Sequence, residues 1–235
     1  NYNNKYVQYK GKRRKMVIKN FKELEEIVGE SKKHTVAVAA AHGDNTLEAV
    51  LKAKEAGFLD YVLVGDAKKI IAIGKSLGKT ICTDDIIDTA DDTESAAKAV
   101  ELIRNGQADF LQKGVLQTAT ILKAVVNKET GIGKGGIMSH VAIIEIPKYH
   151  KLLGVTDGGM IIDADLKHKK AMIENIVELY HKLGYENPKV AAVCAIEHVN
   201  PKMYETIEAM QLKEMNETGE IKGCIVEGPI SLDLA

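Results

Sequence analysis

The sequence predicts an α/β protein with a mostly parallel sheet and helices on both faces. Short apolar runs alternate with amphipathic helical segments from residue 16 to residue 127. The run at residues 35–41 is almost continuously apolar, which is typical of a strand covered on both faces. Helices between consecutive strands favour parallel pairing, because a parallel connection needs a crossover.

The first half of the chain supplies most of this pattern. Asn20 can cap a helix with an apolar stripe that ends at Gly29, and Asp44 or Asn45 can cap a second helix after the buried strand. The other predicted elements here are a strand at 61–64, a helix at 66–78, short strands at 81 and 86–87, a helix from Thr93 to residue 103, a strand at 108–111 and a helix at 118–127.

A glycine-rich stretch at residues 131–136 interrupts the alternation and predicts a crossing into a second domain. Strands at 139–146 and 152–155 follow with only a short connection, which predicts an antiparallel pair. A helix at 165–183, a strand at 190–195, a helix at 203–215 and a strand at 224–226 complete the pattern. We therefore predict a flexible basic extension at 1–15, a first α/β domain at 16–130 and a second at 131–235.

Composition excludes several classes of protein. The formal net charge is −1, so no overall field attracts nucleic acid or an anionic membrane. No apolar run approaches the roughly 20 residues that span a bilayer. The scattered Cys82, Cys194 and Cys224 predict reduced thiols and a cytoplasmic protein, with the last two in the core. For the basic extension, a nucleic-acid or phosphate-binding arm is the alternative to a solvated tail.

Ligands of open α/β sheets bind beyond the carboxyl ends of the strands, so the loops there are candidate sites. The loop with His42, Gly43 and Asp44 follows the first buried strand and opens a helix. A helix N-terminus offers free N–H groups to an anion. A turn glycine followed by a helix cap is the plainer interpretation.

A second loop combines features that suit phosphate. Lys113 and Gly114 precede a helix that opens with Thr118 and Thr120, and Lys123 lies one turn further on. The spacing is not that of a Walker A loop. A surface role for Lys123 is the alternative.

The remaining candidates lie later in the chain. Gly133 and Gly135 allow close approach of backbone to a ligand, or form a plain linker. Asp157 follows a strand and could be a base or a turn cap. His140 reads as a core histidine and His198 as part of a loop. These residues lack metal-ligand spacing, so we expect no metal.

Five stretches resemble the phosphate acetyl/butyryltransferase family, in family order. They are VAVAAAHGDNTLEAV from Val36, KGVLQTATILKAVVN from Lys113, GGIMSHVAIIEIPKYHKLLGVTDGGM from Gly135, NPKVAAVCAIEHVNPKM from Asn187 and GPISLD from Gly228. The pair Ser139–His140 favours the butyryl branch of the family.

The resemblance implies a fold and an activity. The fold would be two α/β domains flanking a cleft, similar to isocitrate and isopropylmalate dehydrogenases, in a homodimer or higher homo-oligomer. The reaction would exchange CoA for inorganic phosphate on a short acyl group such as butyryl, by direct attack of phosphate on the thioester. Acyl-CoA and phosphate would be the partners, with CoA thioester as substrate and no cofactor.

The resemblance also implies roles for particular residues. Lys113, Gly114, Thr118 and Lys123 would bind phosphate, although Lys123 stands where acetyl-type relatives carry arginine. His42, Gly43 and Asp44 would line the cleft and bind substrate or phosphate. Lys123 and Asp157 would be the catalytic candidates in the chain as given, with Asp157 in contact with CoA or substrate.

The family's serine–arginine motif would lie beyond Ala235, in a segment that returns to the first domain. We therefore expect the chain as given to be truncated and nearly inactive. The alternatives are a phosphate acetyltransferase, a branched-chain acyl variant, and a CoA-binding homologue without turnover. A dehydrogenase of related fold is disfavoured, because the dinucleotide fingerprint and an aspartate cluster for metal are missing.

Overall fold

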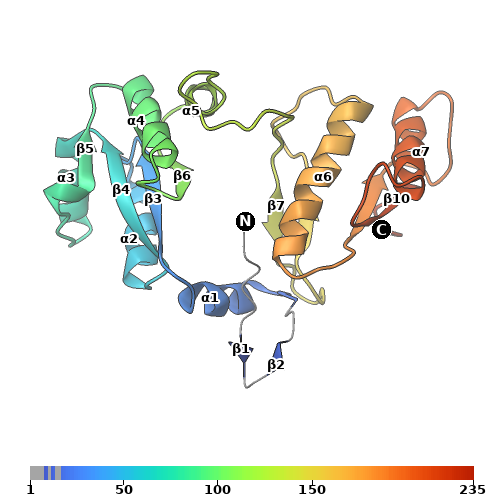
Figure 1. Cartoon of the computed structure of the whole chain (residues 1–235), viewed down its shortest axis with the longest axis horizontal. Helices are drawn as coiled ribbons and strands as arrows, with labels where there is room; N and C mark the ends of the chain where they lie inside the picture. The colour runs from blue at the N-terminus through green and yellow to red at the C-terminus, as the bar shows by residue number, and fades with distance from the viewer. Residues whose placement is uncertain (1–7, 10–11, 14–16) are drawn as a thin grey trace. The chain divides into compact units, whose positions relative to one another are not determined.

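The computed structural model describes residues 8–9, 12–13 and 17–235, which divide into two compact units (Figure 1). One unit is residues 25–135, and the other joins the residues up to 24 to residues 136–235. The predicted basic extension lies outside the described residues except for two short antiparallel strands, β1 (Gln8–Tyr9) and β2 (Lys12–Arg13). The domains predicted at 16–130 and 131–235 stay a prediction.

A four-stranded parallel sheet with the order β5-β4-β3-β6 forms the centre of the unit at 25–135. Helices connect the strands, so the predicted parallel α/β fold is confirmed. The strands are β3 (His34–Ala39), β4 (Leu59–Gly65), β5 (Ile86–Asp88) and β6 (Phe110–Lys113). The helices are α2 (Asp44–Glu55), α3 (Ala67–Ser76), α4 (Asp92–Arg104) and α5 (Thr118–Val125).

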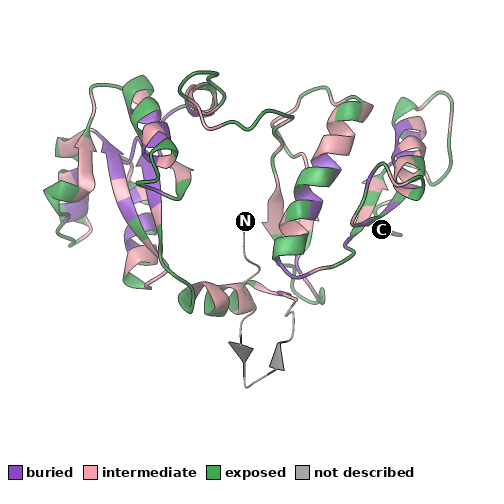
Figure 2. Ribbon diagram, in the orientation of Figure 1, coloured by how far each residue is buried: buried purple, intermediate pink, exposed green. Residues whose placement is uncertain are grey.

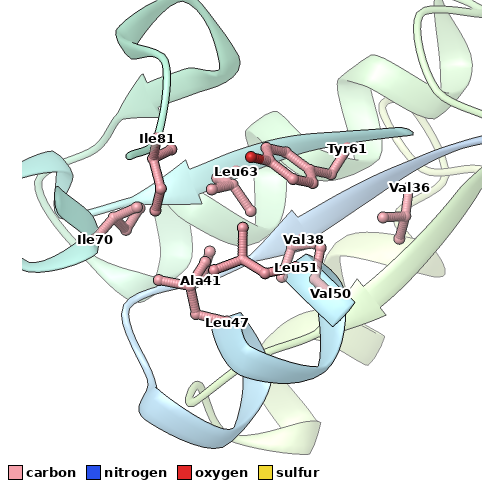
Figure 3. Close-up of a cluster of buried hydrophobic side chains, with 10 residues drawn as sticks. All are labelled: Val36, Val38, Ala41, Leu47, Val50, Leu51, Tyr61, Leu63, Ile70 and Ile81. Carbon is pink, nitrogen blue, oxygen red and sulfur yellow. The ribbon is translucent and has the colours of Figure 1, made fainter. Parts of the chain in front are cut away.

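Alternate residues of β3 point to opposite faces of the sheet, and each face has its own apolar core. Val36 and Val38 pack with side chains of α2 and α3, which Figure 3 shows. Ala37 and Ala39 pack in a second cluster with α4 and α5 that is rich in alanine. Complete burial of one large aliphatic side chain contributes about 1.5–3 kcal/mol, so the first face supplies the larger share of the hydrophobic stabilisation.

The predicted helix starts are partly correct. Asn20 caps the first helix as predicted, because its Oδ1 accepts the N–H of Glu23 at 2.8 Å. The prediction of Thr93 as a cap is wrong by two residues, since the carboxylate of Asp91 takes that position. The predicted cap at residues 44–45 is also displaced, because α2 already begins after Gly43.

The strand predicted at Ile81 is wrong. Ile81 lies in a loop before a short 3-10 turn (Thr83–Asp85), and its side chain is buried against the core of α2 and α3. Its apolar character therefore reflects packing beneath a helix rather than a place in the sheet.

The other unit contains an antiparallel pair and a parallel pair of strands. As predicted, β7 (Ala142–Ile144) pairs antiparallel with β8 (Leu153–Val155). The helix α6 (Leu166–Lys182) is capped by Asp165. The strands β9 (Lys189–Val193) and β10 (Ile225–Ile230) pair in parallel, and the helix α7 (Tyr204–Glu217) connects them in the chain. Figure 2 shows that the buried residues of these elements lie in α6, α7 and β10, whereas β7, β8 and β9 are intermediate or exposed.

Residues 17–24 are joined to this unit by hydrogen bonds. The N–H of Ile18 donates to the carbonyl of Leu183 at 2.9 Å, and the hydroxyl of Tyr185 donates to the carbonyl of Ile18 at 3.0 Å. The N–H of Phe21, the first residue of α1 (Phe21–Gly29), donates to the carboxylate of Glu145 at 2.7 Å. The stretch is therefore attached to residues more than a hundred positions away in the chain.

Candidate functional site

The strand order places a topological switch point beside β3. The chain runs from β3 to β4 on one side and later returns to β6 on the other side. Ligands of open parallel sheets bind at such a point, beyond the carboxyl ends of the strands. The loops that follow β3 and β6 meet there, and they contain His42, Gly43, Lys113 and Gly114 from the predicted site.

These two loops are joined backbone to backbone. The N–H of Gly114 donates to the carbonyl of Ala39 at 2.8 Å, and the N–H of Val115 donates to the carbonyl of Ala40 at 3.1 Å. A Cβ on Gly114 would stand 2.0 Å from the carbonyl oxygen of Ala40, and one on Gly43 would stand 2.3 Å from the side chain of Val115. Both glycines are thus needed for the close approach of the loops.

A buried serine that the sequence did not reveal holds the first loop in place. Ala40 adopts a φ of 53°, a left-handed conformation that is uncommon for alanine. Its N–H donates to Oγ of Ser95 on α4 at 2.8 Å, and the Ser95 hydroxyl donates to the carbonyl of Val64 at 3.0 Å. Ser95 is wholly buried, so its loss would leave a buried N–H without a partner.

Two helices of this unit have N-termini closed by carboxylates. At α3, Asp66 accepts the N–H of Lys69 at 3.0 Å, and Asp88 accepts the N–H of Ala67 at 2.9 Å. At α4, Asp91 accepts the N–H groups of residues 93 and 94, and Glu94 accepts the N–H of Ala90. These N–H groups are not available to a ligand.

The N-terminus of α5 is built differently. Its N-cap residue Gln117 makes no side-chain capping bond, and its first turn contains no acidic residue. The first turn instead carries Thr118 and Thr120. α2 also lacks a side-chain cap, but the carboxylate of Asp44 lies in its first turn. Among the helices of residues 25–135, α5 therefore offers the N-terminus best suited to an anion.

Lys113 lies beside this N-terminus and shapes its loop. Its ammonium donates to the carbonyl of Leu116 at 2.9 Å and to that of Gly114 at 3.2 Å. An ammonium has three donors, so one remains for a ligand. Lys113 thus positions the loop and adds a positive charge next to α5.

Other predicted residues lie away from this point. Lys123 is in the last turn of α5, about 7.5 Å along the axis from Thr118 at 1.5 Å per residue. Gly133 follows the C-terminus of the same helix, where its N–H donates to the carbonyl of Val125 at 3.1 Å, and Gly135 has a φ of 76°. The structure does not group these three residues with Lys113, and their roles stay predictions.

Asp157 belongs to the other compact unit and organises a turn. Its carboxylate accepts the N–H groups of Ile161 at 3.0 Å, of Gly159 and Met160 at 3.2 Å and of His140 at 3.3 Å. Desolvation raises the pKa of Asp157, but these hydrogen bonds outweigh it and hold the pKa below its usual value. A role as ligand or base stays a prediction.

The described residues contain no cluster of three or more side chains suited to a metal ion. No helix in the part of the chain that the structure describes is long and apolar enough to cross a bilayer. Cys194 and Cys224 are buried as predicted, and desolvation raises the pKa of both thiols.

The fold and the switch-point loops together define an α/β protein with an open parallel sheet, in which two glycines allow the loops after β3 and β6 to touch. Comparison with known proteins gives the particular family. The chain belongs to the phosphate acetyl/butyryltransferase family, because the family model described as "Phosphate acetyl/butaryl transferase" matches residues 79–235.

Individual relatives agree with this assignment. The chain is 42% identical over 219 residues to a phosphate butyryltransferase of Clostridium acetobutylicum, covering 93% of this chain and 73% of the relative. It is 41% identical over 214 residues to a phosphate acetyltransferase of Thermotoga maritima, covering 89% and 72%. A solved branched-chain phosphotransacylase from Enterococcus faecalis is similar with a TM-score of 0.71 and 30% identity, covering 86% of this chain and 70% of that chain.

Proposed function

We propose that this protein is an acyltransferase that exchanges CoA for inorganic phosphate on a short-chain acyl group, with butyryl as the preferred acyl group. A phosphate oxygen attacks the thioester carbonyl, the C–S bond breaks, and the products are acyl phosphate and CoA thiolate. The observation that carries the proposal is the uncapped N-terminus of α5 beside Lys113, at the switch point. Such a site holds a phosphate dianion through backbone N–H groups and one ammonium.

Thiol release with butyryl-CoA, measured on the natural full-length protein, tests the proposal. The expected result is release that requires phosphate and saturates with it, together with acyl phosphate detected as its hydroxamate. Release that does not depend on phosphate would instead indicate a thioesterase. Binding of CoA without any release would favour the CoA-binding homologue without turnover.

The acyl group is the finer part of the proposal. The relatives include a phosphate acetyltransferase and a branched-chain phosphotransacylase, so acetyl-CoA and isobutyryl-CoA are the competing substrates. One methylene contributes only about 1–3 kcal/mol of discrimination. Comparing kcat/KM for acetyl-, butyryl- and isobutyryl-CoA therefore decides this point.

Several further features belong to the same proposal. The fold is similar to that of isocitrate and isopropylmalate dehydrogenases, and the protein is cytoplasmic and assembles as a homodimer or higher homo-oligomer. Phosphate is contacted by Lys123, Thr120, Gly133 and Gly135. Asp157 contacts CoA or another part of the substrate. Light scattering of the purified protein tests the assembly.

A further inference from the structure

A polar cavity lies beside the proposed phosphate site without belonging to it. It has a volume of about 550 Å³, and its wall includes His42, Asp66, Lys69 and residues 89–93. These residues follow β3, β4 and β5, whereas α5 follows β6 on the other side of β3. The cavity is therefore placed to hold a part of the substrate other than phosphate.

His42 is held in this wall in a defined tautomer. The N–H of Asp66 donates to Nδ1 of His42 at 3.3 Å. A ring nitrogen that accepts a hydrogen bond carries no proton, so the proton of the neutral ring lies on Nε2. Within the described part of the chain, Nε2 of His42 makes no hydrogen bond. His42 therefore presents one unused N–H donor.

Gly65 makes this arrangement possible. A Cβ on Gly65 would stand 2.7 Å from Nδ1 of His42, and Gly65 has a φ of 150°. The imidazole thus lies directly over the backbone at the end of β4. This contact fixes the ring on the side of the cavity rather than toward α5.

The charges of the wall select the kind of group that fits. Three carboxylates (Asp66, Asp91 and Asp92) face one ammonium, that of Lys69, which pairs with Asp66 at 3.2 Å. Excess carboxylate repels the phosphate groups of CoA but accepts N–H donors. A neutral group with both a carbonyl and an N–H matches a wall that has the His42 donor and carboxylate acceptors.

We propose that this cavity holds an amide of the pantetheine arm of the acyl-CoA, with Nε2–H of His42 donating to the amide carbonyl and a wall carboxylate accepting the amide N–H. This inference rests on the proposed function, since it assigns part of the proposed substrate. His42 is then a binding residue for the thioester and makes no contact with phosphate.

The tautomer can be measured without any catalysis. Long-range ¹H–¹⁵N spectra of the wild-type protein at neutral pH, with the His42 signals assigned by their loss in His42→Gln, should show a proton on Nε2 and none on Nδ1. A proton on Nδ1, or on both nitrogens, would overturn the donor geometry.

Binding of substrate fragments tests the assignment of the cavity. His42→Asn keeps an acceptor near the position of Nδ1 but has no distal donor, whereas His42→Gln can place an amide N–H near Nε2. We expect His42→Asn to weaken pantetheine and CoA about tenfold by calorimetry, the size of one hydrogen bond, and His42→Gln to recover part of the loss. Binding of 3′-phosphoadenosine 5′-diphosphate, which lacks the arm, should stay unchanged.

His34→Asn is the matched control, because His34 lies at the opposite end of β3 and pairs with Asp109. It should leave all three affinities unchanged. A loss in His42→Asn confined to the nucleotide fragment or to phosphate would overturn the assignment, as would equal affinities in all variants. If the wild type releases thiol but His42→Asn binds pantetheine normally, this inference alone fails. If the wild type neither binds CoA nor releases thiol, the proposed function fails with it.

Discussion

Helices α4 and α5 pack on the same face of the sheet, but their first turns are built in different ways. At α4, Asp91 accepts the N–H groups of Thr93 and Glu94 in the first turn. The carboxylate of Glu94 accepts the N–H of Ala90, which precedes the helix. At α5, Gln117 makes no capping bond and Lys113 lies alongside. The N-terminal N–H groups are therefore capped by carboxylates in α4 and left without a side-chain cap in α5.

If phosphate binds as proposed, the difference explains how a fold with several equivalent helix ends would confine an anion to one of them. A capping carboxylate satisfies the N–H donors and places a negative charge where a phosphate would bind. The open helix lies at the switch point, where the loops after β3 and β6 touch. Four substitutions test this contrast, and Gly114→Ala should have the largest effect.

Gly114→Ala should separate the two loops at the open end. The added Cβ would stand 2.0 Å from the carbonyl oxygen of Ala40, and backbone cannot rotate away as a side chain can. We expect a loss of about 3 kcal/mol in the free energy of unfolding, measured by urea denaturation. Gly133→Ala is the control, because its Cβ would meet the carbonyl of Val125 at an ordinary 3.5 Å. Equal losses in the two variants would contradict the role of the contact.

Ser95→Ala should weaken the support of the first loop. It leaves the N–H of Ala40 buried without an acceptor, which we expect to cost about 2 kcal/mol in the free energy of unfolding. The exposed Ser76, whose hydroxyl donates to the carbonyl of Ile73, is the control. Ser76→Ala should change the stability by less than about 0.5 kcal/mol. An unchanged stability in Ser95→Ala would show that the loop holds its shape without this hydrogen bond.

Gln117→Asp should turn the open helix into a closed one. A carboxylate at the N-cap of α5 is expected to stabilise the protein by about 0.5–1 kcal/mol and to raise KM for phosphate about tenfold. Gln107→Asp makes the same change of charge on an exposed residue before the amino end of β6, at the opposite end of that strand from α5, and should leave KM unchanged. A more stable Gln117→Asp with normal phosphate kinetics would show that phosphate binds elsewhere.

Asp157→Asn extends the contrast to a carboxylate that accepts N–H groups in a turn. The folded pKa of Asp157 lies below its unfolded value of about 3.9, so its stabilisation is present above that pH and is lost as the pH falls through the folded pKa. Asp157→Asn should cost about 1 kcal/mol near neutral pH and less in acid. Urea midpoints at about pH 6 and about pH 3 measure this difference. The exposed Asp163→Asn is the control, and an identical loss at both pH values would contradict the expected linkage.

Local signals were sufficient to predict most of the secondary structure. Asn20 and Asp165 are caps that precede clear apolar stripes, and both helices begin where the sequence indicates. Thr93 failed as a cap because Asp91 is a competing acceptor two residues earlier. Ile81 failed as a strand because burial beneath α3 produces the same apolar signal as a strand does.

The sequence predicted the candidate site loop by loop, from residues that are near neighbours in the chain. Lys113, Gly114 and Thr118 lie together because they fall within six residues, at the end of β6, in the loop and at the start of α5. The contacts of Ser95 with Ala40, and of Asp66 with His42, join residues 55 and 24 positions apart. They depend on the register of β3, β4 and the helices, which composition and spacing do not reveal. A buried serine within a helix gives no signal of its own.

The attachment of residues 17–24 also constrains the order in which the protein folds during its synthesis. Ile18 pairs with Leu183 and Tyr185, while residues 25–135 form a unit between them. As the chain leaves the ribosome, the four strands β3 to β6 of that unit have all been translated before the partners of Ile18. Ile18 therefore lacks these partners until roughly 160 further residues have been synthesised. Because closing so long a loop costs conformational entropy, the unit at residues 25–135 should fold first.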